Sequence, residues 1–326
     1  MTDDPVERDR RWPALPGEDT LSSIGFATAQ PAPLSSRSRF PDGGAFRVEI
    51  PSVEGPRALE AVVAEAARRE VIVHRVSQGS GVMMLDDAEI ADMVAIAADA
   101  GIELCLFLGP RGTWDIGGAR FTSSGGAGAR ARGRDQLGQA IADAQRAVAL
   151  GVRCLLVADE GVLWAVHRLR GTGQLPADVT LKMSALTGPV NPASFQVVQR
   201  LGADSINVPS DLTIAQIAEL RAAGSAAIDF YLEAPDDLGG FVRHYDAAEL
   251  VRVGAPIYLK FGLRNATGIY PAGSHLGSVI VESARERVRR AHLVLRRLAE
   301  LGLLEMASPK VSRTMPSARR FADFDD

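Results

Sequence analysis

Lysine and cysteine are scarce in this chain of 326 residues, and long apolar runs are missing. Lysine supplies three of the 36 basic residues, and arginine supplies the other 33. The two cysteines, Cys105 and Cys154, lie in apolar stretches with no CxxC spacing and no Cys/His partner at metal-binding distance in the sequence. This pattern predicts buried, reduced thiols rather than a disulfide or a zinc site. No run of 18 apolar residues occurs, so no transmembrane helix is predicted.

An excess of one charge is missing as well. The net charge of -4 argues against a nucleic acid or an anionic membrane as partner, and small molecules are the expected ligands. The first 20 residues lack the apolar core of a signal peptide, so we expect a cytoplasmic protein. Assembly into a homo-oligomer stays open.

Three regions follow from the patterning. Residues 1–43 are rich in Pro, Ser, Asp and Arg without sustained period, which predicts a disordered N-terminal leader. Residues 44–305 alternate short apolar runs with amphipathic stretches, and residues 306–326 form a C-terminal tail. Strands are expected within 46–51, 71–79, 102–109, 154–159, 179–185, 205–210, 227–235 and 257–263.

Eight strand-helix units of about 30 residues predict an α/β fold with an all-parallel sheet that closes into a (β/α)8 TIM-type barrel. An open doubly wound sheet is the alternative. Its dinucleotide signature GxGxxG is missing after the first strand, where the turn reads PSVEGPRAL.

In such a barrel, alternate side chains of each strand point to the axis. This parity places Lys182 and Ser184 of the fifth strand inward, together with Thr180. The other strands contribute Arg47, Glu49, Ser205, Asn207, Asp229, Tyr231, Glu233, Tyr258 and Lys260. In the second strand the pattern leaves open whether His74 or Arg75 faces inward.

Two of the three lysines therefore lie inside the barrel, near the carboxyl ends of strands where barrel enzymes carry their chemistry. Lysine can lose a proton or form an imine near neutral pH, and arginine cannot. The sequence thus favours a chemical or substrate-binding role for Lys182 or Lys260. Ordinary ion pairing with Asp229 or Glu233 is the alternative.

Carboxylates inside a barrel serve as acid/base groups, as metal ligands or as partners of the lysines. Glu49 and Glu233 are the expected acid/base groups, and Tyr231 is an expected donor to a substrate oxygen. No cofactor is required by this interpretation. A divalent metal stays open, with Glu49, Asp159 and Glu233 as candidate ligands and no HxH or HExxH spacing to define a site.

Loops add further candidates for substrate binding. His74 is either a proton shuttle or a core histidine. Residues 109–135 form a long Gly-rich loop that is either a lid carrying Arg111 or a surface insertion. After the last strand, Arg264, Asn265 and His275 could bind an anionic group, as loops of this kind do in many barrels.

Three stretches, VEIPSVEGPRALEAVV, LGADSINVPSDLTIAQIAELRAAG and FYLEAP, resemble the barrel domain of the U32 peptidase-like family over residues 46–265. The resemblance implies a barrel and, as an alternative function, a hydrolase or an RNA-modifying relative. Family members that hydroxylate RNA or quinone precursors carry four clustered cysteines for an iron-sulfur cluster. This chain departs from them with two separated cysteines.

The leading hypothesis is a barrel enzyme of the aldolase, lyase or isomerase type. Its substrate would be a small, polar, carboxylated or phosphorylated carbonyl compound. One interior lysine would form a Schiff base or abstract a proton, and the other would keep its charge and hold a developing oxyanion. A binding barrel without activity is a further alternative, which the polar interior set argues against.

Overall fold

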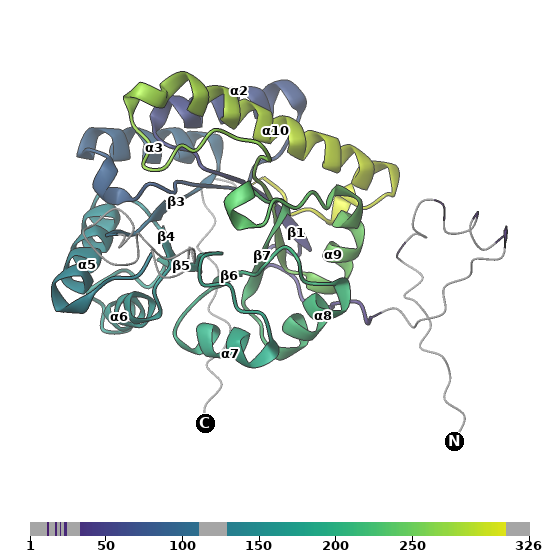
Figure 1. Ribbon diagram of the computed structural model, residues 1–326, viewed down its shortest axis with the longest axis horizontal. Coiled ribbons are helices and arrows are strands. Elements are labelled where there is room, and N and C mark those ends of the chain that lie inside the picture. Colours follow the sequence, from purple (N-terminus) through teal and green to yellow (C-terminus); the bar gives the residue numbers. More distant parts are fainter. Residues whose placement is uncertain are drawn as a thin grey trace.

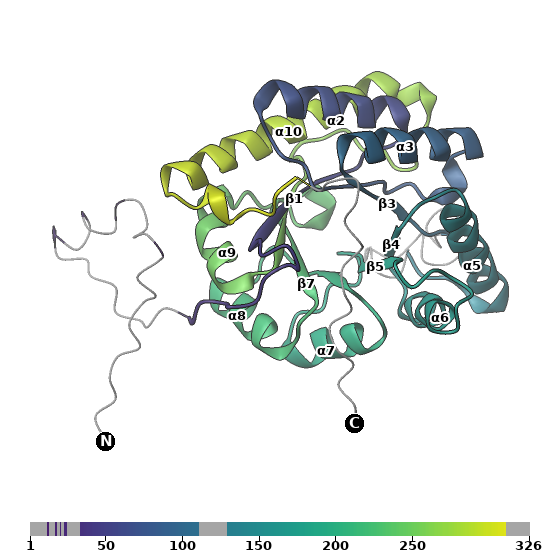
Figure 2. The same cartoon turned by 180° about the vertical axis from the view of Figure 1, so that it is seen from behind.

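A computed structural model shows how the chain folds, and it describes residues 12, 17, 20, 23, 24, 33–110 and 129–310. Eight parallel strands form a closed barrel in the order in which they occur along the chain. The prediction of a (β/α)8 TIM-type barrel is confirmed. Figures 1 and 2 show the helices as a ring around the strands.

The strands are short and buried. Their bounds are β1 Phe46–Pro51, β2 Arg75–Ser77, β3 Glu103–Phe107, β4 Cys154–Val157, β5 Thr180–Met183, β6 Ser205–Asn207, β7 Ala227–Glu233 and β8 Ile257–Phe261. The helices that follow them are α2 Pro56–Arg69, α3 Asp87–Ala100, α5 Gly133–Ala149, α6 Glu160–Gly171, α7 Pro192–Arg200, α8 Ile214–Ala223, α9 Ala247–Gly254 and α10 Gly277–Glu300. Outward side chains of the strands pack against these helices in one apolar core, which contains Ile50, Leu181, Ile206 and Phe230.

Local sequence starts several helices where the patterning predicts. Asp86, Asn191 and Thr213 each cap the following helix and take part in a reciprocal capping box. Gly101 ends α3 with φ 66°, a left-handed conformation that glycine adopts without a side-chain clash. These caps set the length of the helices and hold each loop at a defined end of the barrel.

The end of the predicted leader differs from expectation, because residues 36–43 pack against the barrel. Ser36 N donates to Arg252 O at 2.8 Å, and Phe40 is buried against the ring of Tyr258 at a centroid distance of 5.2 Å. Ser308 N donates to Phe46 O at 2.9 Å, so the start of the predicted tail also closes this end (Figure 2). The amino-terminal end of the barrel is therefore plugged, and the opposite end is the one available to a ligand.

None of the helices in the described ranges is long and apolar enough to cross a membrane.

Candidate active site

Inward side chains are stacked in layers, as the register of the parallel strands dictates. The odd strands contribute a central layer of Glu49, Cys105, Lys182 and Asp229. Above it, toward the carboxyl ends of the strands, the even strands contribute Ser77, Leu156, Asn207 and Lys260. Pro51, Phe107, Ser184 and Tyr231 lie highest.

Glu49 is the centre of a buried charge cluster. Both of its carboxylate oxygens accept hydrogen bonds from Lys182 Nζ, and its Oε1 lies 3.6 Å from Lys260 Nζ. Ser77 Oγ donates to Oε1 at 2.7 Å, and Arg75 Nη1 lies 3.5 Å from Oε2. Burial by itself raises the pKa of Glu49, but attraction to Lys182, Lys260 and Arg75 outweighs it and holds the pKa well below its ordinary value. Glu49 therefore stays ionised and interacts with Lys182, Lys260 and Arg75 at the same time.

Asp229 lies near some of the same cations as Glu49, but it binds a proton more readily. Its Oδ1 lies 3.2 Å from Arg75 Nη1, and its Oδ2 lies 3.9 Å from Lys182 Nζ. Burial raises the pKa of Asp229 despite these cations. Asp229 Oδ2 accepts no hydrogen bond from the residues that the structure describes. The cluster thus contains one carboxylate that stays ionised and one that binds a proton more readily.

A pocket of about 100 Å³ opens above this cluster at the carboxyl ends of the strands. Its floor and walls include Lys260, Asn207, Tyr231, Ser77 and Ser184, with Phe107 and Leu156 on the apolar side. The volume is well below the several hundred Å³ of pockets for drug-sized ligands, which favours a small ligand.

Lys260 is the amine that reaches this pocket. Asn207 Oδ1 accepts a hydrogen bond from Lys260 Nζ, and Asn207 Nδ2 in turn donates to Met183 O at 2.5 Å. The face of the Tyr231 ring lies 4.0 Å from Lys260 Nζ, a cation-π contact. Lys182 is 0% exposed and lies one layer lower, bound to Glu49.

The structure brings together most of the inward residues that the strand parity predicts. Ser184, Asn207, Tyr231 and Lys260 line the pocket, and Glu49, Lys182 and Asp229 lie beneath it. In the second strand, which the pattern left open, Arg75 is the inward residue and pairs with Glu103 at 2.6 Å.

Glu233 does not lie inside the barrel as predicted. A bulge shifts the register of β7, so Tyr231 pairs with Lys260 whereas Glu233 pairs with Phe261. Glu233 Oε2 lies 3.3 Å from His244 Nε2 and 3.7 Å from Arg290 Nε, and Oε1 accepts from Arg264 N at 3.1 Å. The Glu233 carboxylate therefore stabilises the loops outside β7 and β8, and it does not point into the barrel interior.

Asp159 and His74 have structural partners away from the pocket. Asp159 caps α6 by accepting from Val162 N at 2.9 Å, so the three candidate metal ligands Glu49, Asp159 and Glu233 do not converge. His74 Nδ1 accepts from Val48 N at 3.0 Å, and its Nε2 lies 2.8 Å from Ser308 O. These bonds correspond to the core-histidine interpretation.

The loop candidates also lie outside the pocket lining. Arg264 Nε donates to Asp236 at 2.9 Å, and Asn265 N donates to the same carboxylate at 2.6 Å, both at exposed positions. His275 is exposed in a short 3-10 turn before α10. Arg111 lies outside the described residues.

Sequence reasoning missed several residues at or near the pocket, among them the polar or charged residues Ser77, Tyr270 and Arg287. Ser77 has the same parity as Arg75 and would follow from a decision on the second strand. Tyr270 comes from the loop after β8, and Arg287 comes from α10. No periodic signal marks Tyr270 or Arg287, because both reach the site only through the tertiary packing of a loop and a helix.

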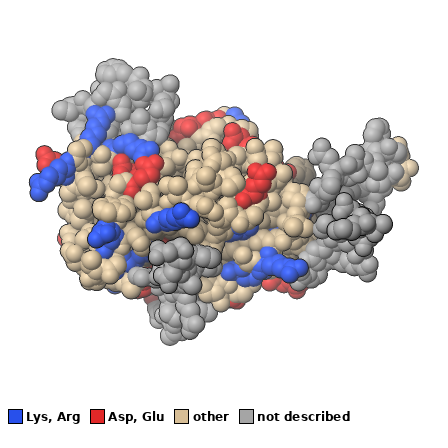
Figure 3. Space-filling model, turned by 90° about the horizontal axis from the view of Figure 1, so that it is seen from below, with Lys and Arg blue, Asp and Glu red and all other residues tan. Residues whose placement is uncertain are grey.

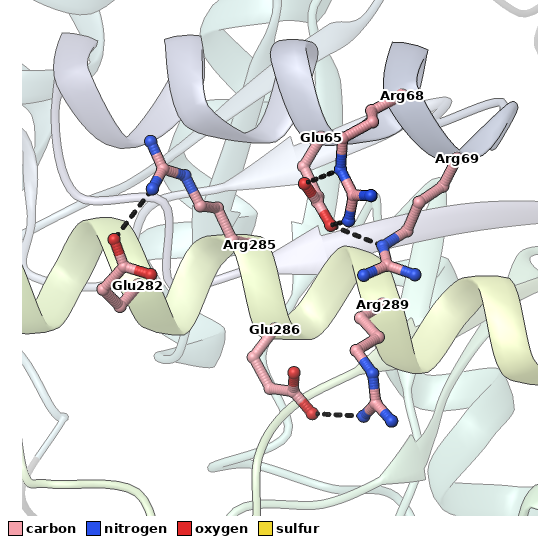
Figure 4. A pocket seen from close by; sticks show the side chains of 7 residues that line it. All are labelled: Glu65, Arg68, Arg69, Glu282, Arg285, Glu286 and Arg289. Carbon is pink, nitrogen blue, oxygen red and sulfur yellow. Dashed lines mark hydrogen bonds and ion pairs between the residues drawn. The ribbon is translucent and has the colours of Figure 1, made fainter.

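A larger hollow, of about 450 Å³, lies on the outer surface between α2 and α10. Figure 4 shows its charged lining, in which Arg68 and Arg69 bind Glu65, Arg285 binds Glu282 and Arg289 binds Glu286. An exposed ion pair of this kind contributes little to the stability of the fold. Figure 3 shows basic and acidic side chains scattered over another face, without a patch of one sign. We therefore place the candidate site in the barrel, where buried polar groups converge.

Cys105 and Cys154 are free thiols and are fully buried. They lie opposite each other on the neighbouring strands β3 and β4. Burial raises the pKa of the Cys154 thiol well above its ordinary value. The thiols lie in the barrel interior among Phe107 and Leu156, where they fill space in the layers below the pocket.

No protein-family model matches this chain. No curated protein matches it either. Solved structures with a similar fold include a U32 peptidase, with 15% identity, a TM-score of 0.42 and coverage of 74% of this chain and 99% of that chain. They also include a proposed fructose-1,6-biphosphate aldolase from Coccidioides immitis, with 11% identity, a TM-score of 0.49 and coverage of 82% and 92%. Thiamine phosphate pyrophosphorylase from Pyrococcus furiosus has 8% identity and a TM-score of 0.43, with coverage of 78% and 98%.

A U32 peptidase is thus among the solved barrel structures to which this chain is similar. At these identities the likeness concerns the fold alone, and function has to be argued from the site.

Proposed function

We propose that this chain is a barrel enzyme of the aldolase, lyase or isomerase type. Its substrate is a small, polar carbonyl compound with a carboxylate or phosphate group. The observation that carries the proposal is the position of Lys260, whose amine lies at the floor of the pocket between Asn207 and Tyr231. A primary amine in a pocket that has an apolar side is suited to forming an imine with a carbonyl carbon.

The chemistry begins with the unprotonated form of the Lys260 amine. Its nitrogen bonds to the carbonyl carbon, and the carbonyl oxygen takes one proton from that nitrogen and a second from solvent or a neighbouring acid. The oxygen leaves as water, and a protonated imine remains. This cation draws electrons from the adjacent carbon, so a carbon-hydrogen or carbon-carbon bond next to it can break.

Neighbouring residues support distinct parts of this sequence. Asn207 Oδ1 accepts an N–H of Lys260 and thereby orients the nitrogen. Glu49 stays ionised 3.6 Å away and stabilises the positive imine. Burial raises the pKa of the Tyr231 hydroxyl, so this group keeps its proton and donates a hydrogen bond to the substrate oxygen. Lys182 keeps Glu49 in place from below.

Borohydride trapping tests this proposal. The protein is incubated with a panel of 2-oxo acids and phosphorylated ketones, reduced with borohydride, digested and analysed by mass spectrometry. The chain offers only Lys182, Lys260 and the exposed Lys310 as lysines, so the modified site is assigned without ambiguity. We expect an adduct on Lys260 that is lost in Lys260→Arg, with Lys310 as an internal surface control.

An adduct on Lys310 alone, or on no lysine with any carbonyl compound, would contradict the imine mechanism. The hydrolase suggested by the U32 resemblance is examined in parallel with peptide and ester substrates. Turnover of those substrates that persists in Lys260→Arg would favour the hydrolase.

A further inference from the structure

Arg287 of α10 is a buried cation with few partners. It is 4% exposed, and its Nη1 donates to Ser52 O at 3.5 Å, which is long for a hydrogen bond. Its Nε has no hydrogen-bond partner among the described residues. None of the described carboxylates lies within ion-pairing distance of its guanidinium. By contrast, the buried Arg75 and Arg252 each pair with a carboxylate at 2.6 Å. A buried charge without such a partner is costly, which points to a ligand that completes it.

This guanidinium stands behind one wall of the pocket. Ser52, which accepts its hydrogen bond, lines the pocket together with Tyr231 and Tyr270. Tyr270 donates its hydroxyl proton to Ser52 Oγ at 2.5 Å. Ser52 adopts φ 60°, the left-handed region that costs a residue with a side chain on the order of 1 kcal/mol or more. The strained backbone therefore presents the Ser52 carbonyl to Arg287 at the edge of the pocket.

The acidic neighbours of this corner are occupied elsewhere. Glu54 accepts from Gly79 N at 2.6 Å and from Ser80 N at 3.1 Å, so its charge is held by backbone amides. Glu233 lies with His244 and Arg290. Burial lowers the pKa of Arg287, and the two tyrosines and two glutamates nearby oppose this shift from a distance. Arginine nevertheless stays charged at neutral pH.

We propose that the corner formed by Ser52, Tyr270 and Arg287 is an anion subsite that binds the acid group of the substrate. This inference rests on the proposed function and narrows it to anionic carbonyl compounds. Tyr231 contacts Lys260 Nζ and also lines the pocket beside this corner, so the acid group and the carbonyl are separated by only a few atoms. A carboxylate and a phosphate share the chemistry that the guanidinium recognises, and the experiment separates them.

The test measures binding without imine chemistry. The full-length protein is titrated by calorimetry with lactate, a carboxylate without a ketone, and with inorganic phosphate. We expect the wild type to bind one of them, and Arg287→Gln to bind it about 10-fold more weakly or worse, as expected for the loss of a charge-assisted contact. Arg287→Lys keeps the positive charge, so its affinity for the anion should fall less than that of Arg287→Gln. Arg285→Gln is the matched control, because Arg285 lies on the same helix, is half exposed and pairs with Glu282.

Equal binding by the wild type and Arg287→Gln, or no binding of either anion by the wild type, would overturn the subsite. If circular dichroism shows that Arg287→Gln is unfolded, Arg287→Lys decides, and unchanged affinity in that variant overturns the proposal. Trapping with pyruvate and with neutral hydroxyacetone separates the two inferences. Preference for pyruvate that persists in Arg287→Gln counts against the subsite alone. Anion binding through Arg287 without any adduct on Lys260 counts against the imine mechanism alone.

Discussion

Glu49 accepts hydrogen bonds from Lys182 through both carboxylate oxygens, and both side chains are 0% exposed. Among the neighbouring charges, Lys182 does most to lower the pKa of Glu49, because a buried interior screens charge only weakly. Lys260, one layer above, shares the same carboxylate at 3.6 Å. The two interior lysines therefore have different positions in one network, Lys182 as a buried anchor and Lys260 as the amine at the pocket.

Removing the anchor should destabilise the fold strongly. Lys182→Met leaves Glu49 with a more distant cation, and we expect a loss of about 3 kcal/mol in the free energy of unfolding, in the range for breaking a buried ion pair. The double variant Lys182→Met, Glu49→Gln should recover much of this loss, because no carboxylate is then left unpaired. Urea unfolding followed by circular dichroism measures both. Equal stability of the single and double variants would show that the pair is not the dominant contact.

His74 predicts how stability depends on pH. Burial lowers the pKa of His74 to about 4, against an ordinary value of 6.5 for histidine. Between these values the unfolded chain binds a proton that the folded chain does not, so this stability is present above pH 6.5 and is lost as the pH falls toward 4. The loss from pH 7 to pH 5 should be about 2 kcal/mol.

The structural reason is that His74 Nδ1 accepts a hydrogen bond from Val48 N, and a protonated Nδ1 cannot accept. Urea unfolding at pH 7 and pH 5 tests this, with His74→Gln as the comparison that lacks the titrating ring. The same pH dependence in both proteins would assign the effect to other groups.

Phe40 should matter for stability and not for chemistry at Lys260. Its ring is buried beneath Tyr258 with Arg47 stacked at 4.2 Å, at the end of the barrel opposite the pocket. Phe40→Ala should lower the free energy of unfolding by about 3 kcal/mol, as for other buried Phe truncations. Leu34→Ala, at a residue that is 70% exposed, should have little effect. A large loss of borohydride trapping in a folded Phe40→Ala would mean that the plug also shapes the pocket.

The two thiols should be inert in the native protein. Both are 0% exposed, and burial raises the pKa of Cys154, so the reactive thiolate is rare. We expect iodoacetamide to add no mass to the folded chain within minutes and to add two carbamidomethyl groups in urea. Rapid labelling of one thiol without urea would indicate that the barrel opens at β3 and β4.

Alternation of apolar and polar residues was enough to predict the barrel and most of its interior. The period of two in strand segments such as VTLKMSA places Lys182 and Ser184 on one face, and closure of eight such strands leaves that face no position except the interior. This reasoning failed at Glu233. A bulge adds a residue to one strand, so the side chains after it point to the opposite side of the sheet from the one that simple alternation predicts. A bulge depends on the pairing of two strands, which a single segment does not reveal.

Amino-acid order by itself determined the eight units, the parity that gathers Glu49, Lys182 and Lys260, and the absence of clustered cysteines. Tertiary structure alone decided which lysine reaches the pocket, since both have inward parity and only the stagger between neighbouring strands sets their depth. It also decided that Arg287 of α10 and Tyr270 of a loop meet Ser52 at the pocket wall. Local periodicity orients a side chain within its own element, whereas contacts between distant elements arise only when the barrel closes and its helices pack.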